Sequence, residues 1–75
     1  MWIRSQDKEL LKNVNNIEII KFDGEKYTTI QGDGYHLGMY SGNEKALRVL
    51  DGIQNQIEYP YNEVFEMPQD EDVEV

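Results

Sequence analysis

The sequence predicts an α+β domain in which one helix packs on an antiparallel sheet. Three observations lead to this fold class. Residues 40–57 carry apolar side chains at helical spacing. The rest of the chain holds short runs of β-branched and aromatic residues between turn signals, and 75 residues can build only one small core. We therefore expect a meander of four to five strands, the amphipathic helix on one face, and a short C-terminal strand.

The predicted helix has one apolar face and a marked start. Apolar residues recur at spacings of four, three and four and so share a face, which a further residue widens: Ala46, Leu50, Ile53 and Ile57, with Val49 beside them. Ser41 and Glu44 form the Ser-x-x-Glu pattern of a capping box, in which the serine oxygen accepts a free backbone N–H. Because an isolated helix of this length is marginal in water, its apolar face must rest on a sheet.

The predicted strands cover residues 2–5, 17–22, 27–30, 35–40 and 63–67. The second of these is apolar on both faces, which is typical of a central strand or of one covered by a partner. Asp23-Gly24 predicts a hairpin, and Gly32-Asp33-Gly34 predicts a second turn. Strict alternation along the fourth strand divides it into two faces, one with Tyr35, Leu37 and Met39 and the other with His36, Gly38 and Tyr40. We expect a single domain over residues 1–68 and a mobile acidic tail over residues 69–75.

The charge of the chain is concentrated in its second part. Net charge is −8, yet the acids and bases of residues 1–48 cancel, whereas residues 49–75 hold eight acids and neither Lys nor Arg. Such a surface repels phosphate backbones, so we expect no direct nucleic-acid binding. The chain has no cysteine, no long apolar run and no apolar signal core at its start. We therefore expect a cytoplasmic protein of a bacterial cell, without disulfides and without a membrane partner.

The residue inventory argues against an enzyme. A nucleophile–base pair would require His36, the one histidine, beside Ser5 or Ser41, together with an orienting acid and an oxyanion site. Nothing in the spacing supports that arrangement. One histidine with scattered carboxylates predicts no metal site, and the glycines do not form a phosphate-binding loop. We expect no catalytic residues and no cofactor.

The most unusual cluster is the N-terminal run Trp2-Ile3-Arg4-Ser5-Gln6. Its indole offers a stacking surface, its guanidinium offers a planar fork for phosphate or carboxylate, and its amide can recognise polar edges. With two residues that share a face of the fourth strand, the predicted ligand-binding set is Trp2, Arg4, Gln6, His36 and Tyr40. The alternative is that Trp2 belongs to the core and Arg4 pairs with an acidic neighbour across the sheet.

Several of these segments resemble a known group of proteins. The opening Trp-Ile-Arg-Ser-Gln, the following Asn-Val-Asn with its Ile-rich strand, the helix segment 46–51 and the closing Phe65-Glu66-Met67-Pro68 occur here in order over almost the whole chain. This pattern resembles small uncharacterised proteins of phages and prophages of Gram-positive bacteria. The resemblance implies an accessory protein of a mobile element, of a kind that often disarms host defences by stoichiometric binding. The group has no settled activity to carry over.

Two functions remain open at the level of sequence. The first is a sponge, a non-enzymatic protein that sequesters a small nucleotide-type signalling molecule of host immunity. The second is an acidic decoy that binds a basic surface of a host defence protein and inhibits it. In either case we expect a homo-oligomer, a dimer, because the core is small and the strand over residues 17–22 is apolar on both faces.

Overall fold

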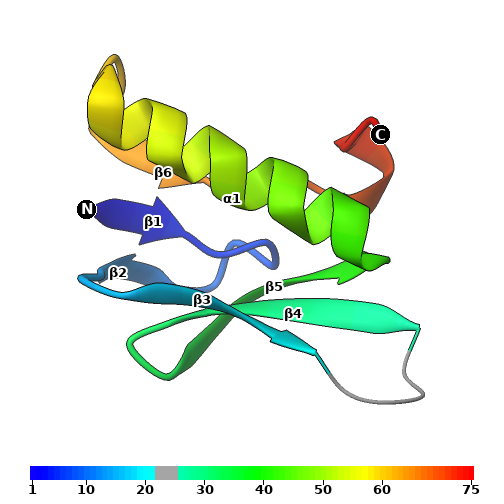
Figure 1. Cartoon of the computed structure of the whole chain (residues 1–75). Helices are drawn as coiled ribbons and strands as arrows, with labels where there is room; N and C mark the ends of the chain where they lie inside the picture. Colours follow the sequence, from blue (N-terminus) through cyan, green and yellow to red (C-terminus); the bar gives the residue numbers. More distant parts are fainter. Residues whose placement is uncertain (22–25) are drawn as a thin grey trace.

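The computed structural model describes residues 1–21 and 26–75 and shows an α+β fold with one α-helix among them (Figure 1). The predicted hairpin at Asp23-Gly24 lies outside the described residues. The elements follow in the order β1 (Trp2–Arg4), β2 (Leu11–Asn13), β3 (Ile17–Lys21), β4 (Tyr27–Gly32), β5 (Tyr35–Ser41), α1 (Asn43–Glu58), β6 (Val64–Glu66) and the 3₁₀ turn η1 (Asp70–Asp72).

The strands form two small sheets, so the prediction of a single four- to five-stranded meander is wrong. Sheet B has the order β3-β4-β5 and is antiparallel, whereas sheet A has the order β2-β1-β6 and pairs β1 in parallel with β6. The two sheets separate at residues 14–16. There the Asp33 carboxylate accepts the backbone N–H groups of Asn15 and Asn16, each at 3.0 Å, and fixes the reversal of the chain between β2 and β3. A parallel partner needs a crossover, which the segment containing α1 provides.

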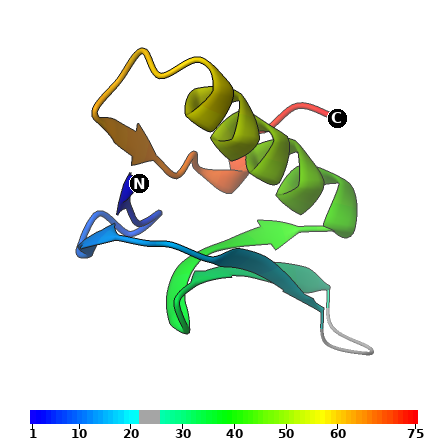
Figure 2. The same ribbon diagram turned by 60° about the vertical axis from the view of Figure 1, so that its left-hand side comes forward.

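The helix has the predicted extent but not the predicted contacts. Its buried residues are Ala46, Val49, Ile53 and Gln56, whereas Leu50 is half-buried and Ile57 is 61% exposed. The buried stripe is therefore rotated relative to the expected one. The reason is that α1 covers parts of both sheets. It packs on β3, β4 and β5 of sheet B (Figure 2). The Phe65 ring of β6 lies near Gly52 of the helix.

The predicted capping box is also wrong. Gly42, with φ 97°, is the N-cap of α1 and leaves the helix start without a side-chain cap. The Ser41 hydroxyl instead donates to the Asp70 carboxylate at 2.7 Å. The backbone N–H of Ser41 also donates to this carboxylate, at 2.8 Å, and the two charge-assisted bonds hold the serine away from the free N–H groups of the helix start.

A β-bulge changes the two faces of β5. Register shifts between Ile30 and Gln31 of β4, so that Leu37 is an extra residue on β5. Leu37 and Tyr40 are both buried, whereas the predicted alternation had placed them on opposite faces. Gly38 makes this possible, since a Cβ at this position would lie only 3.1 Å from atoms of the Tyr40 ring.

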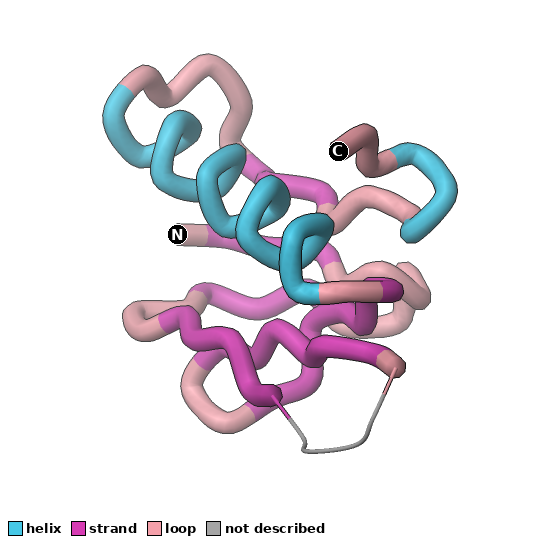
Figure 3. Tube along the Cα trace, turned by 45° about the vertical axis from the view of Figure 1, so that its right-hand side comes forward, coloured by secondary structure: helices cyan, strands magenta, loops and turns pink. Residues whose placement is uncertain are grey.

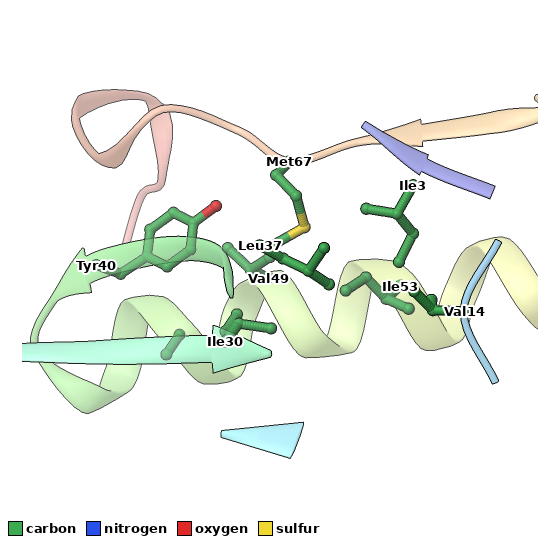
Figure 4. Packing of buried hydrophobic residues seen from close by; sticks show 9 residues of the cluster. Ile3, Val14, Ile30, Leu37, Tyr40, Val49, Ile53 and Met67 are labelled. Carbon is green, nitrogen blue, oxygen red and sulfur yellow. The ribbon is translucent and has the colours of Figure 1, made fainter. Parts of the chain in front are cut away.

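The core lies between the helix and the two sheets. Figure 4 shows the Met67 side chain pointing towards Leu37 and Val49, and these contacts join β5, α1 and the segment after β6. The full set of buried apolar residues is Ile3, Val14, Ile30, Leu37, Tyr40, Ala46, Val49, Ile53 and Met67. Ile17 and Ile19 of β3 pack against this cluster, so sheet B and α1 share one core with residues from the N- and C-terminal segments.

Residues 69–73, which belong to the expected acidic tail, make contacts with the rest of the domain. Gln69 donates its amide N–H to the Gln6 carbonyl at 2.8 Å, and Val73 packs against the core. Figure 3 shows this segment beside the first turns of α1. The contacts extend beyond residue 68 because Asp70 finds donors on Ser41 and Lys45.

The turn between β4 and β5 confirms the prediction at Gly32-Asp33-Gly34. Asp33 and Gly34 both have positive φ, 50° and 84°, as a two-residue hairpin loop requires. No helix in the described residues is long and apolar enough to cross a membrane.

Candidate functional site

Trp2 and Arg4 lie on the outer face of sheet A. The Trp2 side chain is 48% exposed, so it is not the core residue that the alternative reading required. Arg4 Nε donates to the Lys8 carbonyl at 2.6 Å, which holds the guanidinium at the turn after β1. Glu66 is the register partner of Arg4, but its carboxylate pairs with Lys8 at 3.4 Å. The indole and the guanidinium therefore form an open aromatic and cationic face.

The side-chain amide of Gln6 makes its hydrogen bonds within the protein. Its Oε1 accepts the Met39 N–H at 2.9 Å, and its Nε2 donates to the carbonyls of Met39 and Pro68 at 3.1 and 3.3 Å. The side-chain amide thus satisfies backbone groups on the free edge of β5, as a neighbouring strand would. The backbone N–H of Gln6 also donates to the Leu37 carbonyl on this edge, at 2.8 Å. An amide with these partners holds the fold together and has little capacity left for a ligand.

Tyr40 meets Gln6 at the same acceptor. Its hydroxyl donates to the Pro68 carbonyl at 2.8 Å, and the side chain is fully buried. Burial, with a smaller contribution from the charge of Asp70, raises the pKa of Tyr40 well above its usual value. The ring is a core component that also secures the C-terminal segment.

His36 stands apart from the other four residues. It is exposed and lies opposite Gln31 in the register of β4 and β5. The structure therefore brings Gln6 and Tyr40 together at Pro68, places Trp2 and Arg4 on the outer face of sheet A, and leaves His36 on sheet B. The five predicted residues do not converge on one pocket. In the described part of the chain, no three His, Cys, Asp or Glu side chains are grouped to hold a metal ion.

A different surface is assembled where α1 meets the C-terminal segment. One groove of about 260 Å³ has an apolar floor that includes Val49, Phe65 and Val73, with Asp72 and Glu74 on its rim. A second groove of about 280 Å³ is lined by Glu44, Leu47, Arg48 and Asp51. Arg48 borders both grooves. We call this region the acidic surface and define it by four carboxylates around one arginine: Glu44, Asp51, Asp72 and Glu74 around Arg48.

Asp70 holds the two halves of the acidic surface together. Its carboxylate accepts the backbone N–H of Ser41 at 2.8 Å and the Ser41 hydroxyl at 2.7 Å. Lys45 donates to the Asp70 carbonyl at 2.9 Å and lies 3.7 Å from its carboxylate. The two bonds from Ser41 are the main reason that the pKa of Asp70 is lowered. Sequence analysis found the excess of acids but missed this contact, because Asp70 looked like part of a solvated run.

The acidic surface keeps an excess of negative charge, because its four carboxylates outnumber Arg48. The two ion pairs among the described residues are Lys8–Glu66 and Lys45–Asp70. Neither pair includes one of the four carboxylates of the acidic surface. Comparison with known proteins adds no assignment: no protein family, curated protein or solved structure matches this chain.

Proposed function

We propose that this protein is a non-enzymatic accessory binding protein that uses the acidic surface to occupy a basic surface of a partner protein. The observation that supports this proposal is the Asp70 contact, because it fixes the acidic C-terminal segment against α1 and makes one continuous surface from two sequence segments. The resemblance to phage and prophage proteins gives the expected partner, a defence protein of the bacterial host.

The chemistry of the surface suits a protein partner. Uncompensated carboxylates attract a basic partner at long range and speed its association. Leu47, which is 45% exposed, and the apolar floor of the groove offer sites where the stems of lysine or arginine side chains can be buried while their charged ends reach the rim. Gly52 also lines this groove, so no side chain at that position fills it.

A charge-neutralised variant tests the proposal. Asp51→Asn/Asp72→Asn/Glu74→Gln removes three charges of the acidic surface, and Glu9→Gln/Glu18→Gln/Glu63→Gln removes three exposed charges elsewhere. Both variants and the parent are used to capture proteins from a Gram-positive lysate, and the captured protein is purified for calorimetry over a range of salt concentrations. We expect binding by the parent and the control, weaker binding at high salt, and at least about tenfold weaker binding by the first variant.

A captured partner that binds the parent and both variants equally would contradict this function. Failure to capture any basic protein from the lysate would also contradict it. Both variants must first show the thermal stability of the parent.

A second candidate function is the nucleotide sponge, which the open Trp2–Arg4 face favours. Trp2 is the one tryptophan of the chain, so a base stacked on it would change the protein's tryptophan fluorescence directly. A panel of cyclic and ADP-ribose-type nucleotides provides the probes. If a nucleotide binds, Arg4→Lys should weaken it by about 1.5–3 kcal/mol, because lysine keeps the charge but loses the bidentate geometry. No response to any probe would remove this candidate.

A further inference from the structure

Within residues 1–21 and 26–75, no strand pairs with the outer edge of β3. β3 is the outermost strand of sheet B, and β4 is its neighbour on the other side. The Asp33 N–H donates to the Asn16 carbonyl at 2.9 Å, so the backbone of Asn16 faces β4. Because backbone groups alternate along an antiparallel strand, those of Ile17, Ile19 and Lys21 face away from β4.

The edge strands of the two sheets differ in length and in how their free backbone groups are satisfied. The edge of β5 is occupied by side chains, since Gln6 satisfies both backbone groups of Met39 and Asp70 accepts the N–H of Ser41. β2 and β6 are outermost strands of only three residues each. β3 has five residues, three of them isoleucine, with neither proline nor a bulge to protect it. Proteins rarely leave an apolar edge of this kind exposed.

An apolar groove runs beside this edge. It measures about 230 Å³ and lies between α1 and the start of β3. Its lining carries no charge and consists of Asn15, Ile17, Leu50, Ile53, Gln54 and Ile57. The grooves that form the acidic surface, and the cavity of about 340 Å³ beside β6, each include at least one carboxylate. The edge of β3 thus adjoins an uncharged apolar surface in a protein of net charge −8.

We propose that a second copy of this chain covers the edge, with β3 of one copy pairing antiparallel to β3 of the other. The two-fold axis must be perpendicular to the sheet for identical strands to pair in this way. The register that opposes all outward-facing backbone groups sets Ile19 against Ile19, and Ile17 against Lys21, of the two copies. Sheet B becomes a six-stranded sheet and both helices lie on the same face. Each apolar groove, at the start of β3, then lies beside the Lys21 end of the partner's β3.

The distribution of charge favours a second copy of the chain, rather than a basic protein, as the partner at the β3 edge. Two copies of charge −8 repel each other over most of their surfaces, and repulsion is weakest where the groove is uncharged and where Glu18 and Lys21 of β3 cancel. A basic protein would be drawn to the carboxylates of the acidic surface instead. The dimer is therefore independent of the proposed partner-binding function.

Sedimentation equilibrium tests the dimer with a matched pair of helix variants. Ile57→Lys places a charge in the groove, whereas Leu47→Lys places the same charge on an exposed apolar position of α1 outside it. We expect the parent and Leu47→Lys to be dimers. Ile57→Lys should raise the dimer dissociation constant by about 100-fold or more, because the substitution occurs twice in a symmetric interface. Circular dichroism must show that both variants are folded.

Engineered disulfides test the register. The chain has no cysteine, and the proposed register sets Glu18 of one copy opposite Ile20 of the other in a pair without mutual hydrogen bonds, where Cα atoms are close enough for a disulfide. Oxidised Glu18→Cys/Ile20→Cys should run as a covalent dimer, and Glu18→Cys alone should not cross-link efficiently. A monomeric parent at the highest soluble concentration would overturn the proposal. A dimer insensitive to Ile57→Lys, without cross-linking, would overturn the interface.

Discussion

Replacing Gln6 by alanine is expected to destabilise the whole domain, although Gln6 looked from its sequence context like a ligand-binding residue. The substitution removes three side-chain hydrogen bonds, two to Met39 and one to Pro68. A hydrogen bond contributes about 0.5–1.5 kcal/mol net, and the two bonds to Met39 are exposed, so water can replace part of their contribution. We therefore expect a loss of about 2 kcal/mol. For a domain of this size, that corresponds to a fall in Tm of roughly 8–16 °C.

Thermal and urea unfolding monitored by circular dichroism measure this effect. Gln54→Ala is the matched control, because the Gln54 amide makes one exposed bond to Glu58 on α1, and its loss should change stability by less than about 0.5 kcal/mol. If Gln6→Ala unfolds together with the parent, the reasoning that assigns Gln6 to the fold is refuted and its amide becomes available to a ligand.

Gln6→Glu sharpens the same test. It keeps the shape of the side chain but replaces the N–H donor by a carboxylate that faces the carbonyls of Met39 and Pro68. This environment favours the protonated acid, so the carboxyl pKa should rise on folding. The stability of the variant relative to the parent should then be highest below the pKa of an unfolded glutamate, about 4.3, and fall as the pH rises through the higher folded value. A pH-independent difference from the parent would contradict this explanation.

Four further predictions concern other contacts. Gly52→Ala should raise stability by about 0.5–1 kcal/mol, because a Cβ there meets its nearest atoms at an ordinary 3.7 Å and glycine weakens a helix interior; a lower Tm would contradict this. Ile53→Ala should cost about 2–5 kcal/mol in urea unfolding, and Leu50→Ala clearly less, because Ile53 is 2% exposed and Leu50 only half-buried; equal losses would restore the predicted helix face. Tyr40→Phe should cost about 1 kcal/mol, the worth of its hydroxyl bond, in the same assay. The pKa of Asp70 is lowered in the folded protein, so its contribution to stability is present above the unfolded value of about 3.9 and is lost as the pH falls through the folded one. The protection of C-terminal amides against hydrogen exchange, relative to their intrinsic exchange rate at each pH, should therefore fall in acid, and should not do so in Asp70→Asn.

Local patterns predicted the elements of this fold well. The helix, five of the described strands and the turn at Asp33-Gly34 follow from spacing, β-branched runs and residues that accept positive φ. These features depend on neighbours in sequence, which a single chain records directly. The strand Leu11–Asn13 was not predicted, because three residues are too short for a periodic pattern.

Tertiary structure decided which strands pair, which face of the helix is buried and where the candidate site lies. The parallel pairing of β1 with β6 joins residues more than 60 positions apart, and periodicity carries no information about such pairs. One extra residue at Leu37 reversed the expected faces of β5. The role of Gln6 and the attachment of Asp70 depend on backbone groups left free at the edge of β5, which exist only once the sheet has formed. The sequence by itself determined the amount and the sign of the surface charge. Its concentration beside α1 arose from long-range hydrogen bonds between side chains and that strand edge, which local sequence patterns cannot encode.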